Sequence, residues 1–295
     1  MAGENNNLAV RTYTKEFKEM LQAVFEKAAM FGDFFVGGVE ALDGIQHNAK
    51  AFSVKTSDIP VTVGDGYNTD ADVAFGDGTA NSSRFGEMTE IIYTDTDVEY
   101  AWGWNWHEGI DRYTVNNDFD TAIADRLQLQ AEAKTELFNA KHSAFISATA
   151  QKTITVKEVT EEAVIAAFNE LHKYYVNIKA KGTPVAKVTA DIINALVDAN
   201  LTTTAKGSSV NIDRETVTMF KGIAIDEIAE DYFQDDEIAY IYIPGIAKAF
   251  TGIETSRTIE ADDFDGVKFQ GAGKAGEYIL PANKAAVAKV VVSQG

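Results

Sequence analysis

Residues 117–149 read NDFDTAIADRLQLQAEAKTELFNAKHSAFISAT, a stretch without glycine or proline. On a helix, its regularly spaced apolar residues would follow one slowly drifting stripe. These residues are Phe119, Ile123, Leu127, Ala131, Phe138 and Phe145. Because an α-helix rises about 1.5 Å per residue, about 30 residues make a rod of roughly 45 Å. The average helix has only about 11 residues. The stretch therefore predicts one unusually long helix.

Upstream of this helix, two strand-like segments flank a polar middle. Residues 51–63 (AFSVKTSDIPVTV) and 91–106 (IIYTDTDVEYAWGWNW) read as strands, whereas residues 64–87 hold too few apolar side chains to bury. This order predicts a long hairpin that projects from the body of the protein. An isolated two-stranded ribbon is only marginally stable, so the hairpin needs a partner surface.

Acidic charge is concentrated in this part of the chain. The formal net charge is −19, and residues 56–133 carry 16 Asp or Glu, three Arg and no Lys, a net charge of −13. The remaining residues carry only −6, so the acidic stretch is a distinct surface element. The charge also disfavours nucleic acid as a general partner, because binding to phosphate backbones relies on Lys and Arg.

Composition excludes further classes of protein. With 295 residues, of which 45% are hydrophobic, the chain is long enough for a sizeable core. It has no cysteine, which excludes disulfides, thiol nucleophiles and thiolate metal sites. No apolar run approaches the roughly 20 residues that span a bilayer, and the first residues lack the pattern of a signal peptide. We therefore expect a soluble, cytoplasmic protein.

The N-terminal residues predict an arm followed by a helix. Residues 1–12 are polar and rich in asparagine, which is typical of a mobile arm. Thr14 can cap a helix over residues 14–28. Its apolar stripe consists of Phe17, Leu21, Val24, Phe25 and Ala28. Its basic flank consists of Lys15, Lys18 and Lys27.

The C-terminal half alternates helices and strands, which is typical of an α+β domain. Thr160 can cap a helix that begins with Glu161 and Glu162. A second helix is expected over residues 189–201. Strands are expected over residues 184–188, 216–228 and 237–245, and the final segment, residues 266–292, is again strand-like.

The glycines Gly271, Gly273 and Gly276 formally match the dinucleotide-binding pattern GxGxxG. That site needs a helix after the glycines to receive the pyrophosphate, but both flanks read as strand. We therefore predict a glycine hairpin turn.

For the other candidate sites, a functional role has less support in the sequence than a purely structural role. His107 and Glu108 lack the second histidine of a zinc-protease motif. The remaining candidates are scattered histidines (His47, His142, His172) and acidic groups without EF-hand spacing (Asp262, Asp263, Asp265). No nucleophile, base and orienting group come together in the sequence. We therefore expect no catalytic residues, no bound metal and no cofactor.

The tryptophans Trp102, Trp104 and Trp106 would share one face of a strand. Such a stripe could stack sugars or anchor a protein contact, where tryptophan is enriched. We favour packing against the long helix or against a neighbouring subunit.

Taken in order, these parts resemble the major capsid proteins of tailed phages with the HK97-type fold along nearly the whole chain. The closest likeness is in the C-terminal half, where YIYIPGIAKAFTGIETSRTIEADDFDGVKFQGAGKAGEYI is similar to capsid proteins of siphophages from Gram-positive hosts. The resemblance implies an α+β capsid fold with six parts. These are an N-terminal arm (1–30), a connection to the peripheral domain (31–49), an E-loop (50–106), the peripheral domain with its spine helix (107–159), an axial domain (160–255) and C-terminal strands that complete the sheets (256–295).

The resemblance also implies a structural role without enzymatic activity. The subunit would form pentamers and hexamers of an icosahedral shell that encloses double-stranded DNA without sequence-specific binding. It would assemble in the host cytoplasm, without a membrane, and reside in the virion. Its partners would include portal and decoration proteins. Met1 stands directly before the arm, so we expect a separate scaffolding protein or none.

The charge pattern suggests how neighbouring subunits touch. Basic groups of one N-terminal arm (Arg11, Lys15, Lys18) would face acidic groups of a neighbour's E-loop (Asp65, Asp70, Asp72, Asp77). Arg84 and the three tryptophans are further candidates for contacts between subunits. Some members of the family cross-link through an E-loop lysine, but Lys55 lies at the base of this loop and no lysine follows before residue 134. We therefore expect a shell without covalent cross-links.

Two alternatives remain open at this point. One is an encapsulin-like bacterial compartment, which would enclose an enzyme cargo instead of DNA. The other is a carbohydrate-binding surface or tail module that uses the tryptophan stripe, in which Trp104→Ala would abolish sugar affinity.

Overall fold

The computed structural model describes residues 29–42, 50–57, 59–64, 66–69, 84–86, 88–115, 119–202, 209–211, 216–252 and 254–293. The predicted arm (1–12) and the predicted helix (14–28) lie outside the described residues. The chain divides into two compact units, one of residues 45–99 and one of residues 1–44 with 100–295. We call the smaller unit the ribbon and describe each unit by itself.

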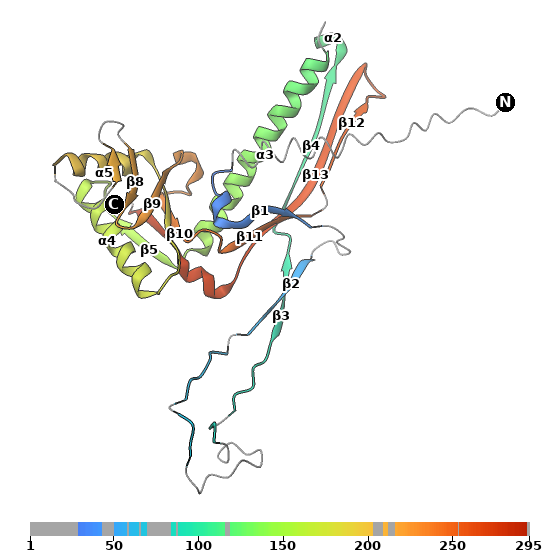
Figure 1. The fold of residues 1–295 in the computed structure, drawn as a ribbon. Helices are drawn as coiled ribbons and strands as arrows, with labels where there is room; N and C mark the ends of the chain where they lie inside the picture. The colour runs from blue at the N-terminus through green and yellow to red at the C-terminus, as the bar shows by residue number, and fades with distance from the viewer. Residues whose placement is uncertain are drawn as a thin grey trace. The chain divides into compact units, whose positions relative to one another are not determined.

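The predicted long helix is confirmed. Helix α3 (Phe119–Thr149) has 31 residues and follows the short helix α2 (Arg112–Val115). In Figure 1, α3 runs alongside strands β4 and β13 of the same unit. Both α3 and these strands bury apolar side chains against each other, as Trp104 of β4 and Phe138 of α3 do. None of the helices among the described residues has the length and apolar content that a membrane crossing requires.

A five-stranded sheet lies beside α3. Its strand order is β1-β11-β13-β12, with β4 also paired to β13. The strands are β1 (Phe35–Ala41), β4 (Trp102–Asp111), β11 (Ala247–Thr251), β12 (Thr255–Glu260) and β13 (Gly266–Ile279). Strand β13 has 14 residues and pairs antiparallel with β4, β11 and β12. It is therefore the strand that holds this sheet together.

The second sheet has seven strands in the order β5-β14-β10-β6-β9-β8-β7. The strands are β5 (Lys152–Val156), β6 (Val185–Val188), β7 (Ser209–Asn211), β8 (Thr216–Phe220), β9 (Ile223–Glu227), β10 (Glu237–Tyr242) and β14 (Val287–Val292). Two helices pack on it, α4 (Glu161–Asn177) and α5 (Ala190–Thr202). Short 3-10 helices are η1 (Gly32–Phe34), η3 (Glu230–Tyr232) and η4 (Pro281–Ala286).

Strand β10, an inner strand of this sheet, is buried on both faces. Because side chains alternate along a strand, Ala239 and Ile241 enter the core with α4 and α5. Tyr240 and Tyr242 enter a second core, which includes Phe34 and Ile146 from η1 and α3. The aromatic run of β10 therefore joins the two parts of the larger unit.

Regular pairing in the ribbon is shorter than the sequence predicts. Strand β2 (Lys50–Thr56) pairs antiparallel with β3 (Thr94–Glu99), whereas residues 59–64 and 90–93 are in no strand. Pro60 has no backbone N–H to donate to a ladder, which disfavours its continuation there. The ribbon ends at Glu99 and not at residue 106, because Trp102–Trp106 pair with β13.

The predicted glycine turn at residues 271–276 was wrong, because these residues lie inside β13. Their small size serves a different purpose. A Cβ atom added to Gly271 would lie 2.2 Å from Trp106 Cε2, and one added to Gly273 would lie 2.4 Å from Trp104 Cζ2. The glycines therefore leave space for the tryptophan rings of the adjacent strand.

Candidate functional site

The tryptophan stripe of β4 faces α3, as one of the two favoured packing modes predicted. The rings of Trp104 and Trp106 are stacked, with centroids 4.7 Å apart and planes 19° apart. Trp102 meets Phe138 of α3 edge to face at 4.7 Å. The alternation of side chains along a strand places the three tryptophans on the same face of β4. This part of the site was therefore predictable from the sequence.

A buried polar chain lies behind Trp102. Trp102 Nε1 donates to both carboxylate oxygens of Glu277 at 3.2 Å. Glu277 Oε1 in turn lies 3.0 Å from His142 Nδ1. His142 also lies against the ring of Phe35 at 4.5 Å. This chain joins β4, β13, α3 and β1. Sequence reasoning treated His142 as one of several scattered histidines and missed Glu277, since their separation of 135 residues gives no local signal.

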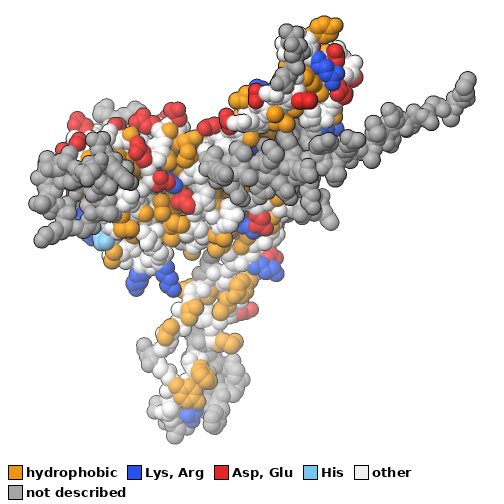
Figure 2. Space-filling model, turned by 45° about the horizontal axis from the view of Figure 1, so that its top comes forward, with side chains coloured by type: hydrophobic (Ala, Val, Ile, Leu, Met, Phe, Trp, Pro, Cys, Tyr) orange, Lys and Arg blue, Asp and Glu red, His pale blue; other side chains and the backbone are white. Residues whose placement is uncertain are grey.

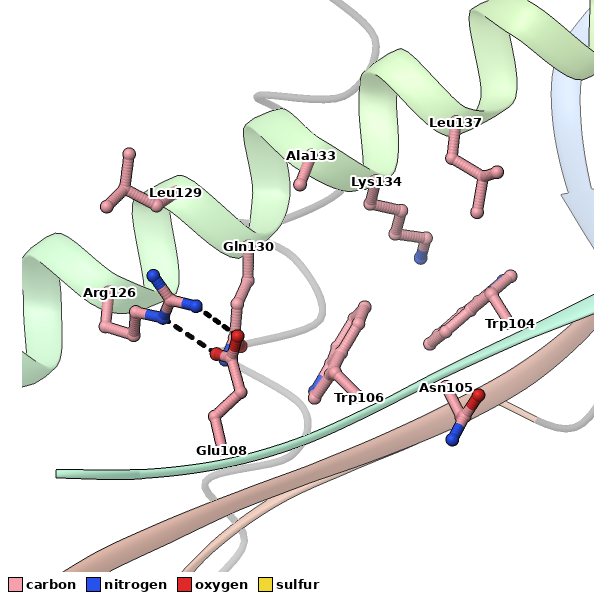
Figure 3. Close-up of a pocket in the computed structure, with 10 residues that line it drawn as sticks. All are labelled: Trp104, Asn105, Trp106, Glu108, Arg126, Leu129, Gln130, Ala133, Lys134 and Leu137. Carbon is pink, nitrogen blue, oxygen red and sulfur yellow. Dashed lines mark hydrogen bonds and ion pairs between the residues drawn. The ribbon is translucent and has the colours of Figure 1, made fainter.

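A groove of about 300 Å³ opens between β4 and α3. Figure 3 shows how its residues lie: the stacked Trp104 and Trp106 rise from β4, and Gln130, Lys134 and Leu137 descend from α3.

The charged groups of the groove are paired with each other. Arg126 Nε donates to Glu108 Oε2 at 2.7 Å, its Nη2 donates to the other carboxylate oxygen, and Gln130 Nε2 donates to Glu108 Oε2 at 2.6 Å. The hydrogen bond from Arg126 holds the pKa of Glu108 below its ordinary value, although burial acts in the opposite direction. Lys134 bonds to Glu254 and lies over the Trp104 ring at 4.7 Å.

Three buried polar atoms of the groove residues lack a partner. Within the part of the chain that the structure describes, Trp104 Nε1, Trp106 Nε1 and Gln130 Oε1 are buried and make no hydrogen bond. Buried polar groups are nearly always paired in folded proteins. Two donors and one acceptor therefore remain unsatisfied around one groove.

The ribbon presents apolar side chains to solvent. Val61 and Val63 are 87% and 85% exposed, and Figure 2 shows hydrophobic side chains gathered on the surface of this unit. The paired end is polar: Lys50 bonds to Asp97 and Lys55 lies 3.8 Å from Asp95. The ribbon therefore has a charged base and an apolar extension.

Only some of the predicted contact residues are described. Arg84 joins the two sides of the ribbon far from its paired base, because the Arg84 carbonyl accepts a hydrogen bond from Asn68 N at 2.9 Å. Next to it, the rings of Tyr67 and Phe85 meet edge to face at 5.0 Å. The other predicted residues lie outside the described residues, and they are Arg11, Lys15, Lys18, Asp65, Asp70, Asp72 and Asp77.

The described residues offer no group of three or more His, Asp or Glu side chains that could hold a metal ion. Asp262 and Asp263 instead pair with Lys268 at 2.5 and 2.6 Å, and Asp265 pairs with Arg112 at 2.9 Å. These aspartates lie in the connection between β12 and β13. Their interpretation as turn residues is confirmed.

Comparisons with known proteins identify the fold. No protein-family model matches the chain, and no curated protein matches it. Among solved structures, the capsid of the cyanophage P-SCSP1u matches with a TM-score of 0.65 at 13% identity, over 90% of this chain and 89% of that chain. The mature capsid of bacteriophage PhiM1 matches with a TM-score of 0.63 at 11% identity, over 90% and 87%. A structure from Mycobacterium phage Che8 matches with a TM-score of 0.60 at 13% identity, over 83% and 85%. The predicted α+β, HK97-type fold is thereby confirmed.

Proposed function

We propose, from the HK97-type fold that this chain has, that it is the major capsid subunit of a tailed phage. It assembles into pentamers and hexamers of an icosahedral head that encloses double-stranded DNA, and it acts as a structural protein and not as an enzyme. The observation that carries the proposal is the match over 90% of the chain to a cyanophage capsid. Because the match covers 90% of this chain and 89% of that chain, it supports the role of the whole subunit.

The ribbon supports assembly as the function. A two-stranded ribbon with solvent-exposed valines is marginal by itself, and binding to another subunit stabilises it by mass action. Folding of the ribbon and formation of the shell are therefore coupled. The acidic residues of the ribbon contact the basic N-terminal arm of a neighbour through Arg11, Lys15 and Lys18.

The shell is held by non-covalent contacts. Lys55 lies near Asp95 in the paired base of the ribbon, and residues 56–133 contain no lysine to supply an amine. Purified particles boiled in denaturant are therefore expected to run as a single band of 32.1 kDa on a gel. A ladder of covalent oligomers would contradict this expectation.

The surroundings of the subunit follow from the same role. It is a component of the virion that assembles in the host cytoplasm, together with portal and decoration proteins and, where one is needed, a separate scaffolding protein. The acidic net charge of −19 suits a container whose DNA is packed without sequence-specific binding.

Electron microscopy of the purified full-length protein tests the proposal, with size-exclusion chromatography at low and high salt. Closed shells, or rings of five and six subunits, would support it. A strictly monomeric protein under all conditions would count against it.

The contents of such particles distinguish a phage head from a compartment for enzyme cargo. Packaged DNA in particles from infected cells supports the phage head, and a protein cargo without DNA contradicts it. The carbohydrate-binding alternative receives no support, because Trp104 is buried between Trp106 and α3.

A further inference from the structure

One end of the seven-stranded sheet carries lysines without acidic neighbours along the chain. Two segments, residues 171–186 and residues 216–225, contain four lysines and no Asp or Glu. These exposed residues are Lys173, Lys179, Lys181 and Lys221, and we call them the lysine patch. In a chain with 45 acidic and 26 basic residues, the patch is opposite in sign to the protein as a whole.

Hydrogen bonds hold the parts that carry the patch together. The four lysines lie on α4, on the connection after it and on the turn between β8 and β9. His172 Nδ1 of α4 donates to the carbonyl oxygen of Lys221 in that turn at 2.9 Å. Ala224 N donates to Pro184 O at 2.9 Å, which fixes the connection after α4 beside the same turn. The lysines therefore belong to one surface.

The positive charges of the patch have no internal partner. None of the ion pairs among the described residues includes a patch lysine. The carboxylates that border the two segments are already paired, Glu170 with Lys152 and Asp226 with Lys187. Because like charges repel each other, a partner with several negative charges would be favoured here.

Two of the patch lysines occupy backbone positions that favour glycine. Lys179 has a φ of 54° and Lys221 has a φ of 51°, in the left-handed region where an L side chain crowds the backbone. Gly or Asn usually fills such a position after a helix or in a two-residue hairpin turn. The only other non-glycine residue with a positive φ in the described part of the chain is Asp236. Strain that is kept at two lysines of one patch indicates that their charges are used.

The chemistry of the patch favours an acidic polypeptide over nucleic acid. Val176, which is 61% exposed, lies one turn after Lys173 and thus on the same face of α4. An apolar side chain beside lysines suits a peptide that carries both carboxylates and apolar groups. The continuous charge of a DNA backbone would extend beyond the patch onto a protein of net charge −19, whereas a short peptide confines its charge to the lysines.

We infer that the lysine patch binds an acidic segment of a protein other than this chain. The carboxylates of that segment pair with the lysines, and its apolar side chains cover Val176. The inference goes beyond the proposed function and rests on it only in excluding a second copy, whose acidic ribbon is assigned to the N-terminal arm. Binding should weaken with salt, because ion pairs at an exposed surface are screened.

A fluorescent oligoglutamate peptide with one central leucine is the probe, and its anisotropy with unassembled, full-length protein gives the affinity. The same peptide with Gln in place of Glu is the control ligand. The double variant Lys179→Gly, Lys221→Gly removes two charges and should bind the peptide about fivefold more weakly. Its midpoint of thermal unfolding should stay the same or rise, because glycine adopts the left-handed backbone without strain.

A control variant, Lys141→Gln with Lys157→Gln, changes the net charge equally at two exposed positions outside the patch. Lys157 follows the end of β5 that pairs with Val292, whereas the patch lies at the opposite end of the sheet. The control variant should bind the peptide like the wild type. Weaker binding in the double variant alone, at undiminished stability, supports the inference.

Four results would overturn the inference. They are no binding of the peptide to the wild type, equal affinity in the two variants, a lower unfolding midpoint in the double variant, and tighter binding of a short DNA duplex through the same lysines. Particle formation is scored separately by sedimentation. A lower yield of particles in the double variant would make the patch a contact between copies and overturn the inference as well. Absence of particles from the wild type counts against the proposed function alone, since the peptide is bound by unassembled protein.

Discussion

At the scale of single residues, glycines and tryptophans of neighbouring strands depend on each other. Gly271 and Gly273 of β13 lie opposite Trp106 and Trp104 of β4 in the ladder. The sequence revealed that the tryptophans share a face, because that follows from alternation along a strand. It did not reveal the purpose of the glycines, since a glycine-rich stretch reads locally as a turn and the rings come from residues more than 150 positions away.

Gly271→Val should destabilise the protein by about 1–3 kcal/mol, because the added atoms overlap the Trp106 ring and force repacking. Urea unfolding of the unassembled protein measures the change. Gly64→Ala is the control, because a Cβ there meets nothing within 4 Å. Adding Trp106→Ala to Gly271→Val should recover part of the loss. Equal stability of Gly271→Val and the wild type would refute this account of the glycine.

Glu108 should contribute a pH-dependent part of the stability. Its pKa is lowered below the ordinary 4.5 by Arg126, so the contribution is present above pH 4.5 and is lost as the pH falls through the lower, folded-state value. Because the Arg126 side chain is 42% exposed, we expect only about 0.5–1 kcal/mol.

Urea unfolding of the wild type and of Glu108→Gln at several pH values measures this contribution. The variant should be less stable at neutral pH, and the difference should shrink below pH 4.5. A difference that stays constant with pH would exclude the ion pair as its cause.

At the scale of elements, helices with local signals were predictable. Thr160 caps α4 by accepting a hydrogen bond from Ala163 N at 3.3 Å, and α3 begins and ends close to its predicted limits. These features depend on neighbours within one turn. The length of the β2–β3 ladder was overestimated, because composition does not reveal where two strands stop pairing.

Thr160→Ala should cost about 1 kcal/mol, since the first turn of α4 loses its side-chain acceptor. Thr160→Ser keeps a hydroxyl and should stay within a few tenths of a kcal/mol of the wild type. The midpoint of urea unfolding gives both values. Identical losses in the two variants would show that the methyl group of Thr160, and not the cap, is responsible.

At the scale of the whole molecule, the order of the described parts was predictable but the groove between β4 and α3 was not. The order of hairpin, long helix and α+β domain follows from patterns along the chain. The groove depends on Glu108, Arg126 and Gln130 from two elements, and its unsatisfied atoms become visible only after folding. No spacing in the sequence indicates them.

If the acidic ribbon contacts the arm of a neighbour, assembly should weaken with salt, because the screening length falls from about 10 Å at 0.1 M to about 3 Å at 1 M. Replacing Arg11, Lys15 and Lys18 by Gln should lower the yield of particles in sedimentation at low salt. The control replaces the exposed Lys157, Lys173 and Lys181, which changes the net charge equally. Equal yields from both triple variants would eliminate the contact.

Strand β13 also has a mechanical consequence. It is bonded to β4 over ten successive residue pairs, from Gly266 opposite Asp111 to Ala275 opposite Trp102, and to β12 or β11 on its other edge. Tension along this strand acts in shear and loads many hydrogen bonds simultaneously. A force across the strand instead breaks these hydrogen bonds one at a time. The five-stranded sheet is therefore stiff when it is stretched along β13 and weak when it is peeled across this strand.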